Sequence, residues 1–78
     1  MIIYCYDLKI KNPNAYNTLK RRFYYHLKKS SISKAPWKTK SVLAVPDKLE
    51  KLADTFFRQW RGFIEVYKIR ADEIEQLL

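Results

Sequence analysis

The chain has 78 residues, so it can form one small domain with a single modest core. Its hydrophobic content of 47% is typical of a folded protein. One glycine, one cysteine and one histidine exclude a Walker loop, a dinucleotide fingerprint, an internal disulfide, and cysteine-rich or histidine-rich metal sites. No apolar run is long enough for a bilayer and no basic leader precedes Ile2, so we expect a reduced, cytoplasmic protein without a membrane partner.

The positive charge is concentrated in the first part of the chain. Residues 1–46 contain ten basic residues and one acid and carry +9, whereas residues 47–78 contain six basic residues and seven acids and carry −1. This asymmetry is typical of nucleic-acid binding, because cations near phosphates release condensed counterions. The alternatives are a basic surface that serves only solubility, or one that meets an anionic membrane.

Residues 2–10 are rich in β-branched and aromatic side chains and predict a strand. Tyr4 and Tyr6 share one face of this strand with its other even-numbered residues, while Cys5 and Asp7 lie on the opposite face. Both faces begin apolar, which favours a central position in a sheet. If Tyr4 and Tyr6 faced outward, they could form a base-stacking platform with Tyr67.

A helix is predicted from Pro13 to about Lys29, with Asn12 as its cap. The residues at helical spacing that should face the core are Tyr16, Leu19, Phe23 and Leu27. The cations expected on the outer and flanking faces are Lys20, Arg21, Arg22, Lys28 and Lys29. His26 is either an acid–base group for RNA cleavage or, as is more common, a half-exposed helix histidine.

Residues 30–36 are small and polar and predict a loop, after which residues 37–46 return to strand character. Residues 37–40 would form a hairpin arm or bent strand, and residues 42–45 a buried strand that Pro46 ends. Three cations and one aromatic residue lie close together in sequence here: Lys34, Trp37, Lys38 and Lys40. Such a set can track phosphates while the aromatic stacks on a base, although Trp37 can equally be a core anchor.

Asp47 and Glu50 have the spacing of a capping box and predict a second helix. Its apolar stripe would consist of Leu49, Leu52, Ala53, Phe56 and Trp60, and Gly62 would stop it. Residues 63–69 again predict a strand. Residues 71–78 form an acidic, helix-prone tail with a small apolar edge.

The element order predicts a single α+β domain over residues 1–78, a ferredoxin-like βαββαβ sandwich. Right-handed crossovers place both helices on one face of an antiparallel sheet. The other face is then bare and needs a partner, either a second protomer or stacked bases. We therefore expect a homodimer, in which the tail is a candidate contact segment.

Asp7 is the one acid of the basic segment and lies near the end of the first strand. A carboxylate can hold Mg²⁺, and two copies across a dimer axis with substrate phosphates would make a fuller site. Alternatively, Asp7 pairs with a lysine or caps the following loop. Ser41 either bonds a phosphate or is an ordinary strand-entry hydroxyl, and Cys5 is expected to be a small core hydrophobe.

The chain resembles the small CRISPR-associated protein of spacer acquisition, the Cas-two family, or a diverged relative of it. The resemblance rests on Tyr6-Asp7 in the first strand, on Lys40-Ser41-Val42 before a helix that starts with a proline, and on the basic Lys68 in the last strand. It covers most of the chain in element order, through motifs that are specific only in combination.

The resemblance implies a ferredoxin-like homodimer that binds nucleic acid, with duplex DNA or RNA as the expected ligand, and that in some members cleaves it with Mg²⁺. It also implies a larger integrase-type partner. By this likeness Asp7 is a metal ligand and a catalytic residue, and Ser41 a catalytic residue of the same cleft. The alternatives are a non-catalytic nucleic-acid-binding module, such as a regulator or structural bridge, and a protein-interaction domain.

Overall fold

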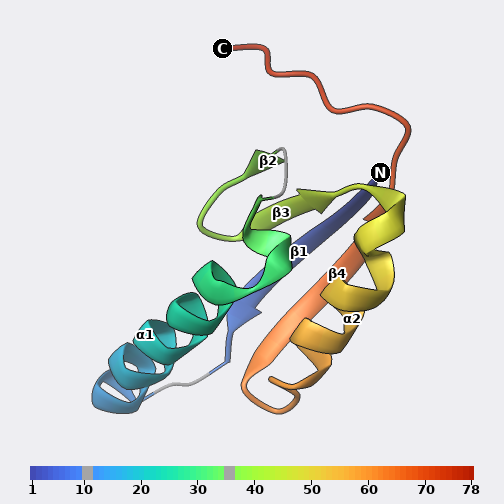
Figure 1. Ribbon diagram of the computed structural model, residues 1–78. Helices are drawn as coiled ribbons and strands as arrows, with labels where there is room; N and C mark the ends of the chain where they lie inside the picture. The colour runs from blue at the N-terminus through green and yellow to red at the C-terminus, as the bar shows by residue number, and fades with distance from the viewer. Residues whose placement is uncertain (10–11, 35–36) are drawn as a thin grey trace.

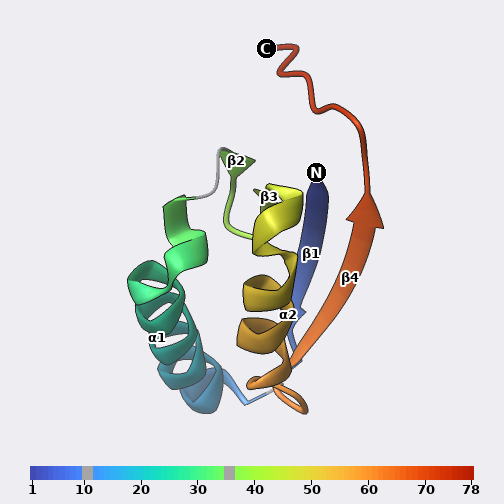
Figure 2. The same cartoon turned by 45° about the vertical axis from the view of Figure 1, so that its right-hand side comes forward.

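A computed structural model describes residues 1–9, 12–34 and 37–78, with Trp37 and Lys38 described by their backbone alone. Four strands form one antiparallel sheet in the order β2-β3-β1-β4. Two helices cover one face of it (Figures 1 and 2). The elements, in chain order, are β1 (Ile2–Leu8), α1 (Pro13–Lys29), the 3-10 turn η1 (Ser31–Lys34), β2 (Trp37–Lys38), β3 (Val42–Val45), the 3-10 turn η2 (Asp47–Leu49), α2 (Glu50–Arg58) and β4 (Ile64–Arg70).

This arrangement confirms the predicted ferredoxin-like fold. Chain order βαββαβ and sheet order β2-β3-β1-β4 place the first and last strands side by side, although they lie at opposite ends of the sequence. Two helical crossovers produce this arrangement. Helix α1 connects β1 to β2, and α2 connects β3 to β4, and in each case the two connected strands are not adjacent in the sheet. The predicted extension of the first strand to Ile10 falls outside the described residues.

The central strand β1 decides which side chains form the core. It pairs over Ile2–Leu8 with β4 and over Ile2–Cys5 with β3. Its side chains alternate, so Ile2, Tyr4 and Tyr6 are buried beneath the helices, with at most 5% of their surface exposed. The outward-facing platform considered for Tyr4 and Tyr6 is therefore wrong, and Tyr67 alone of the three tyrosines is largely exposed.

Helix α1 forms as the sequence predicts. The Asn12 side chain accepts hydrogen bonds from the backbone N–H groups of Asn14 and Ala15, and Pro13 occupies the first helical position. Leu19, Phe23 and Leu27 are buried on the core face, as expected. The chain leaves the helix through the 3-10 turn η1, whereas the sequence predicts a loop over these residues; the turn brings Ile32 inward, where it is fully buried.

Helix α2 is displaced from its predicted start. Residues 47–49 form η2, and neither η2 nor α2 has a side-chain cap, so the predicted capping box is wrong. The Asp47 carboxylate instead lies 2.6 Å from the Met1 nitrogen. The apolar stripe is also rotated from its expected position, since Leu52 is 52% exposed whereas Phe57 is buried.

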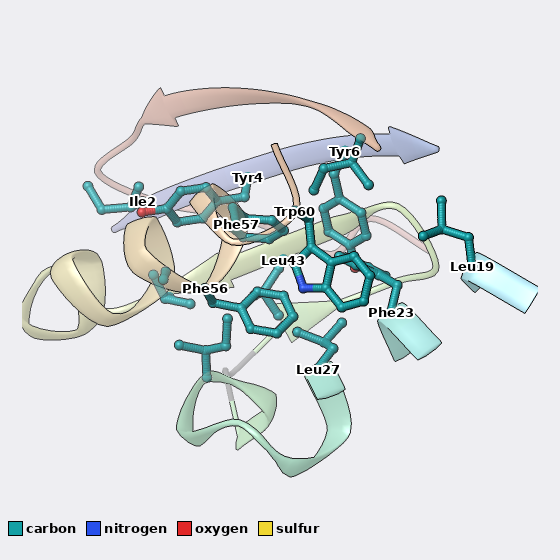
Figure 3. Close-up of a cluster of buried hydrophobic side chains, with 14 residues drawn as sticks. Ile2, Tyr4, Tyr6, Leu19, Phe23, Leu27, Leu43, Phe56, Phe57 and Trp60 are labelled. Carbon is teal, nitrogen blue, oxygen red and sulfur yellow. The ribbon is translucent and has the colours of Figure 1, made fainter. Parts of the chain in front are cut away.

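The core is an aromatic cluster between the helices and the sheet, and Figure 3 shows its packing. Phe23 lies at its centre, fully buried, with ring centroids 5.5 Å from Tyr6, 5.6 Å from Phe56 and 5.3 Å from Trp60. Phe57 stacks on Tyr4 at 5.0 Å. These contacts join both helices to β1 and fix the relative position of the elements that carry the polar groups.

The N-terminus and the end of β4 lie side by side at one end of the sheet. The Ala71 N–H donates a hydrogen bond of 3.0 Å to the Met1 carbonyl, which extends the β1–β4 pairing by one step. Gly62, at φ 89°, lies in the tight turn before β4. The sequence predicts that it stops the second helix, but α2 ends earlier, at Arg58, with Gln59 as its C-cap. Residues 71–78 are all described and contain no helix, contrary to the expectation for this tail, which runs away from the domain (Figure 1).

Candidate nucleic-acid interface

The solvent-facing surface of α1 is strongly basic. The helix has 17 residues, five of them Lys or Arg and none of them acidic. The five side chains, all exposed, are Lys20, Arg21, Arg22, Lys28 and Lys29. Within the part of the chain that the structure describes, none of these cations forms an ion pair with a carboxylate; Lys29 lies over the Tyr25 ring, 4.7 Å from its centroid.

The cations of β4 have the opposite environment. Lys68 forms ion pairs with Glu50 and, at 2.9 Å, with Asp54. Arg70 donates two hydrogen bonds to the Glu50 carboxylate, at 2.7 and 3.1 Å. The Tyr4 hydroxyl completes this α2–β4 network by donating a 2.6 Å hydrogen bond to Asp54. These cations therefore have acid partners within the fold, unlike those of α1.

The pKa values of the network follow from these contacts. Hydrogen bonds from Arg70 and Lys68 lower the pKa of Glu50 below its ordinary value. For Asp54, desolvation raises the pKa, but the hydrogen bonds from Tyr4 and Lys68 together with nearby positive charge outweigh it, and the pKa falls below its ordinary value. Burial and the Asp54 carboxylate strongly raise the pKa of Tyr4, so that its hydroxyl remains a donor.

The two predicted catalytic residues lie together on the sheet face that the helices leave open. Asp7 and Ser41 line one cleft of about 390 Å³, bounded also by Cys5, Tyr67 and Glu65. The backbone holds the two residues close together, because the N–H of Tyr6, the residue before Asp7, donates a 2.9 Å hydrogen bond to the Ser41 carbonyl. Asp7 accepts a 2.9 Å hydrogen bond from the N–H of Leu8, the last residue of β1, and among the described residues it forms no ion pair with a lysine.

Glu65 is a member of this cleft that the sequence analysis missed. It lies directly opposite Asp7 in the β1–β4 register, so that two exposed carboxylates stand side by side. Like charges at directly opposed positions destabilise a sheet. The Tyr67 hydroxyl donates a 2.7 Å hydrogen bond to Glu65, and this bond raises the pKa of Tyr67. Only the strand register reveals the pair, because 58 positions separate the two acids in sequence.

The other predicted contact residues are spread over two sides of the domain. Lys20 and Lys40 line one small pocket between α1 and the end of β1, together with Tyr6. Arg21 borders a shallow hollow on α1, whereas Arg22 lies beside His26 and Trp60. Lys34 is exposed at the end of η1. The side chains of Trp37 and Lys38 are outside the described part of the structure, so their roles remain predictions.

Two further predictions concern single residues. His26 is exposed, and its ring lies 5.4 Å from that of Tyr25 and 5.8 Å from that of Trp60, as suits a helix-surface histidine. Cys5 is half-buried on the open face and not in the core cluster, contrary to expectation. The described residues contain no group of three or more His, Cys, Asp or Glu side chains arranged to hold a metal ion.

Comparison with known proteins gave no relative: no family model, no curated protein and no solved structure matches this chain. Among the residues that the structure describes, no helix has the length and apolar character needed to cross a bilayer. Functional assignment therefore depends on the site itself.

Proposed function

We propose that the protein is a cytoplasmic nucleic-acid-binding protein and that the outer surface of α1 contacts the phosphate backbone. The observation that supports this proposal is the group of five exposed cations on a helix without acids, each unpaired with a carboxylate among the described residues. Surface cations normally alternate with acids, because like charges close together on a helix repel. A helix surface on which cations repel one another is suited to binding a polyanion, because the phosphates neutralise the cations and remove the repulsion.

The dimensions of α1 favour an extended partner. Seventeen residues at about 1.5 Å each make a helix of roughly 25 Å. Duplex nucleic acid carries one negative charge per about 1.7 Å of its axis, so the helix can face several phosphates at once. Contacts of this kind position a protein on the duplex without reading sequence. We therefore propose duplex DNA or RNA as the ligand.

We further propose that the protein acts as a homodimer through the open sheet face. Tyr67 is 63% exposed and Ile69 47% exposed on that face, beside the half-buried Cys5 and Val42. A small domain gains stability by covering such apolar surface with a second copy. Light scattering at micromolar concentration tests this, and a monomer would overturn it.

The binding proposal is tested with two matched triple variants. In Arg21→Gln/Arg22→Gln/Lys28→Gln, three cations of α1 are removed. In the control Arg58→Gln/Arg61→Gln/Lys51→Gln, the same residue types are removed from α2 and the turn that follows. Affinity for a labelled 30-base-pair duplex is measured by fluorescence anisotropy over a series of salt concentrations.

We expect the α1 variant to lose most of its affinity. Its log–log salt slope should fall by up to about 2.7, since each phosphate contact contributes about 0.9. The control should keep the wild-type slope. Equal affinity and equal slope in wild type and the α1 variant would refute the assigned surface.

A second candidate function, Mg²⁺-dependent cleavage, is favoured by the Asp7–Glu65 pair. Mg²⁺ is commonly held by one or two carboxylates, with waters and substrate phosphates completing its octahedron. Asp7 and Glu65 each have one carboxylate oxygen engaged in a hydrogen bond and a second available, so the pair fits this limited donor set. When bound, the ion would polarise a phosphate and activate a water. Asp7 and Glu65 would orient it, and Ser41 lies within the same cleft.

Cleavage is tested on labelled duplex DNA and single-stranded RNA with Mg²⁺ or EDTA, using wild type, Asp7→Asn and Glu65→Gln. Cutting that needs Mg²⁺ and is lost in both variants would establish a nuclease. Binding without cutting, equal in all three proteins, would establish a non-catalytic scaffold or regulator in which the acid pair is structural.

A further inference from the structure

The second half of α1 and the turn between α2 and β4 border a hollow on the surface of the domain. Its volume is about 210 Å³. The described residues that line it are Arg22, His26, Gln59, Trp60 and Phe63, of which three carry rings, one is a cation and none is an acid. Ordinary ligand pockets measure about 300 Å³ or more, so this hollow can receive one flat ring and leaves the rest of a larger ligand outside.

Phe63 is the unusual side chain of this hollow. The protein has four phenylalanines, and the other three have at most 8% of their surface exposed, whereas Phe63 is 47% exposed. The three buried rings all pack on other aromatic rings, but among the described residues the Phe63 ring contacts none. A single exposed apolar side chain is ordinary on a protein surface. What distinguishes Phe63 is how firmly its ring is held and what lies beside it.

The turn that carries Phe63 is held through both backbone groups of that residue. The Phe63 N–H donates a 3.0 Å hydrogen bond to the Trp60 carbonyl, and the Phe63 carbonyl accepts a 2.9 Å hydrogen bond from the Lys9 N–H. Gly62, at φ 89°, supplies the left-handed step of the turn. The chain after α2 and the chain after β1 thus fix the residue that presents the ring. A ligand that stacks on this ring therefore has little backbone to order.

The other walls join the hollow to the basic surface of α1. The Trp60 ring is 9% exposed and packs edge-on against Phe23, with the centroids 5.3 Å apart, so the aromatic core holds this wall in place. The His26 ring lies 5.8 Å from that of Trp60. Arg22, about one helical turn before His26, lines the hollow and is also one of the five exposed cations of α1. An aromatic hollow is therefore continuous with a surface of positive charge.

We propose that this hollow receives one unpaired base of the nucleic acid that α1 contacts, with the base stacked on the Phe63 ring. Proteins hold unpaired nucleotides without reading sequence by combining such rings with cations that follow the phosphate backbone. Arg22 would contact a phosphate of the same strand, and the exposed Gln59 amide offers a donor and an acceptor to the edge of the base. A base inside a duplex cannot enter, because it would first have to leave the stack.

This inference deepens the proposed function, and it rests on that function for the contact between α1 and a duplex. It names the substrate class as a duplex with an unpaired nucleotide beside it, as at an overhang or a bulge. The cations of α1 position the protein on the phosphates, and the stacked base adds a preference for one structure of the strand. The two contributions respond to different substitutions, so the experiment can separate them.

The first measurement compares labelled duplexes of one sequence by anisotropy: blunt, with a short unpaired 3′ or 5′ extension, and with the same extensions built from abasic nucleotides. Abasic extensions keep the phosphates and lack the bases. We expect wild type to bind one base-bearing extension about tenfold more tightly than its abasic counterpart, the size of one stacking contact. Phe63→Leu, which keeps an apolar side chain, should lose most of this preference and keep its affinity for the blunt duplex. Tyr25→Leu, which removes another exposed ring, is the control.

The second measurement places the fluorescent base 2-aminopurine in the extension, because its emission falls when it stacks on another ring. Wild type and Tyr25→Leu should quench it, while Phe63→Leu should do so far less. Salt separates the two contributions: Phe63→Leu should keep the wild-type salt slope, whereas Arg22→Gln should lower it by up to about 0.9. The thermal midpoint of Phe63→Leu should stay close to that of wild type, since the ring is half exposed, which separates loss of stacking from loss of fold.

The outcomes are distinct. A preference for bases over abasic nucleotides that survives in Phe63→Leu, or no preference and no quenching in wild type, would overturn the stacking site while leaving duplex binding through α1 intact. An equal loss of preference in Tyr25→Leu would also overturn it, since the effect would not belong to the hollow. Binding of an unpaired strand that depends on Phe63, without affinity for the blunt duplex, would support the stacking site and refute the duplex as the ligand of α1.

Discussion

The two helices lie on the same face of the same sheet and pack into one aromatic core, yet their outer surfaces differ in kind. Helix α1 carries five cations and no acid, whereas the acids of α2, Glu50 and Asp54, hold the cations of β4. The acids of α2 therefore have partners within the fold, whereas the cations of α1 are presented to solvent without acid partners among the described residues. Because both helices contribute comparably to the core, stability does not explain the difference.

The comparison separates what the fold needs from what a ligand needs. Around α2, removing a charge leaves a partner behind in a partly buried site, and the fold suffers. In the middle of α1, where Lys20, Arg21 and Arg22 are consecutive, removing a charge relieves repulsion, and the fold is expected to be unaffected or slightly more stable. Substitutions in the core, in the α2–β4 network and on α1 test this separation.

The core that the helices share should respond most strongly. Phe23→Ala is expected to lose about 3–5 kcal/mol of unfolding free energy, since Phe23 is fully buried and contacts rings from both helices and β1. This is a large part of the stability of a small domain. Urea unfolding followed by circular dichroism measures it, with the half-exposed Tyr25→Ala as control; similar losses in the two variants would contradict the described core.

Breaking the α2–β4 network should cost less but still clearly destabilise. Asp54→Ala removes the 2.6 Å acceptor of the buried Tyr4 hydroxyl, which keeps the Glu50 carbonyl at 3.3 Å, and it also removes an ion-pair partner of Lys68. Together these losses should cost about 1–3 kcal/mol. Lys28→Ala on α1 should change stability by about 0.5 kcal/mol or less, as exposed positions do. Equal effects of the two substitutions would remove the distinction between the helices.

The pH dependence of stability should trace the same network. The folded-state pKa values of Glu50 and Asp54 lie below their ordinary values of 4.5 and 3.8, so their contribution is fully present above those values. It is lost as the pH falls through the lower folded-state values. Urea midpoints measured between pH 7 and pH 2.5 should therefore decline below about pH 4.5 in wild type.

Two variants sharpen this pH experiment. In Asp54→Ala the acid decline should be shallower, because one of the two groups that titrate on unfolding is gone. In Arg21→Gln the wild-type profile should persist, since Arg21 takes no part in the network. A wild-type profile in Asp54→Ala would show that the acid sensitivity arises elsewhere.

The smallest effect concerns the first turn of α1, which contains no acidic residue, whereas the first turn of α2 contains Glu50. Ala15→Glu should stabilise the protein by about 0.3–1 kcal/mol through the helix dipole. The same substitution should weaken duplex binding, since it places a negative charge on the basic helix. Thermal midpoints and anisotropy measure the two effects, and stronger duplex binding would speak against the proposed surface.

Local sequence chemistry predicted the fold well. Helix α1 has a cap, a proline at its start and a clear apolar stripe, and it begins and ends where those signals indicate. Element order then limited the topology to one arrangement. Local sequence chemistry could not predict which face of β1 is turned toward the helices. The strand β1 begins apolar on both faces, so only the packed helices decide that Tyr4 and Tyr6 point inward.

The candidate site was predictable only where its members are close in sequence or unusual in type. Asp7 stood out as the one acid of a basic segment, and Ser41 through the resemblance. Glu65 did not stand out, because its importance comes from its position opposite Asp7 in the sheet. Likewise, the sequence predicts Leu52 as a core residue, but Phe57 is buried in its place. The way α2 crosses the sheet stacks the Phe57 ring on Tyr4.

The central position of β1 has a consequence for the time scale on which the site moves. This strand has a hydrogen-bonded neighbour on each side over its first half, so its amide protons should be among the slowest of the domain to exchange with solvent. Tyr6 and Asp7 belong to it, whereas residues 71–78 should exchange almost at once. A metal ion held at Asp7 would bind the folded state alone and raise the free energy of global opening, so it should slow the exchange of the protected β1 amides further.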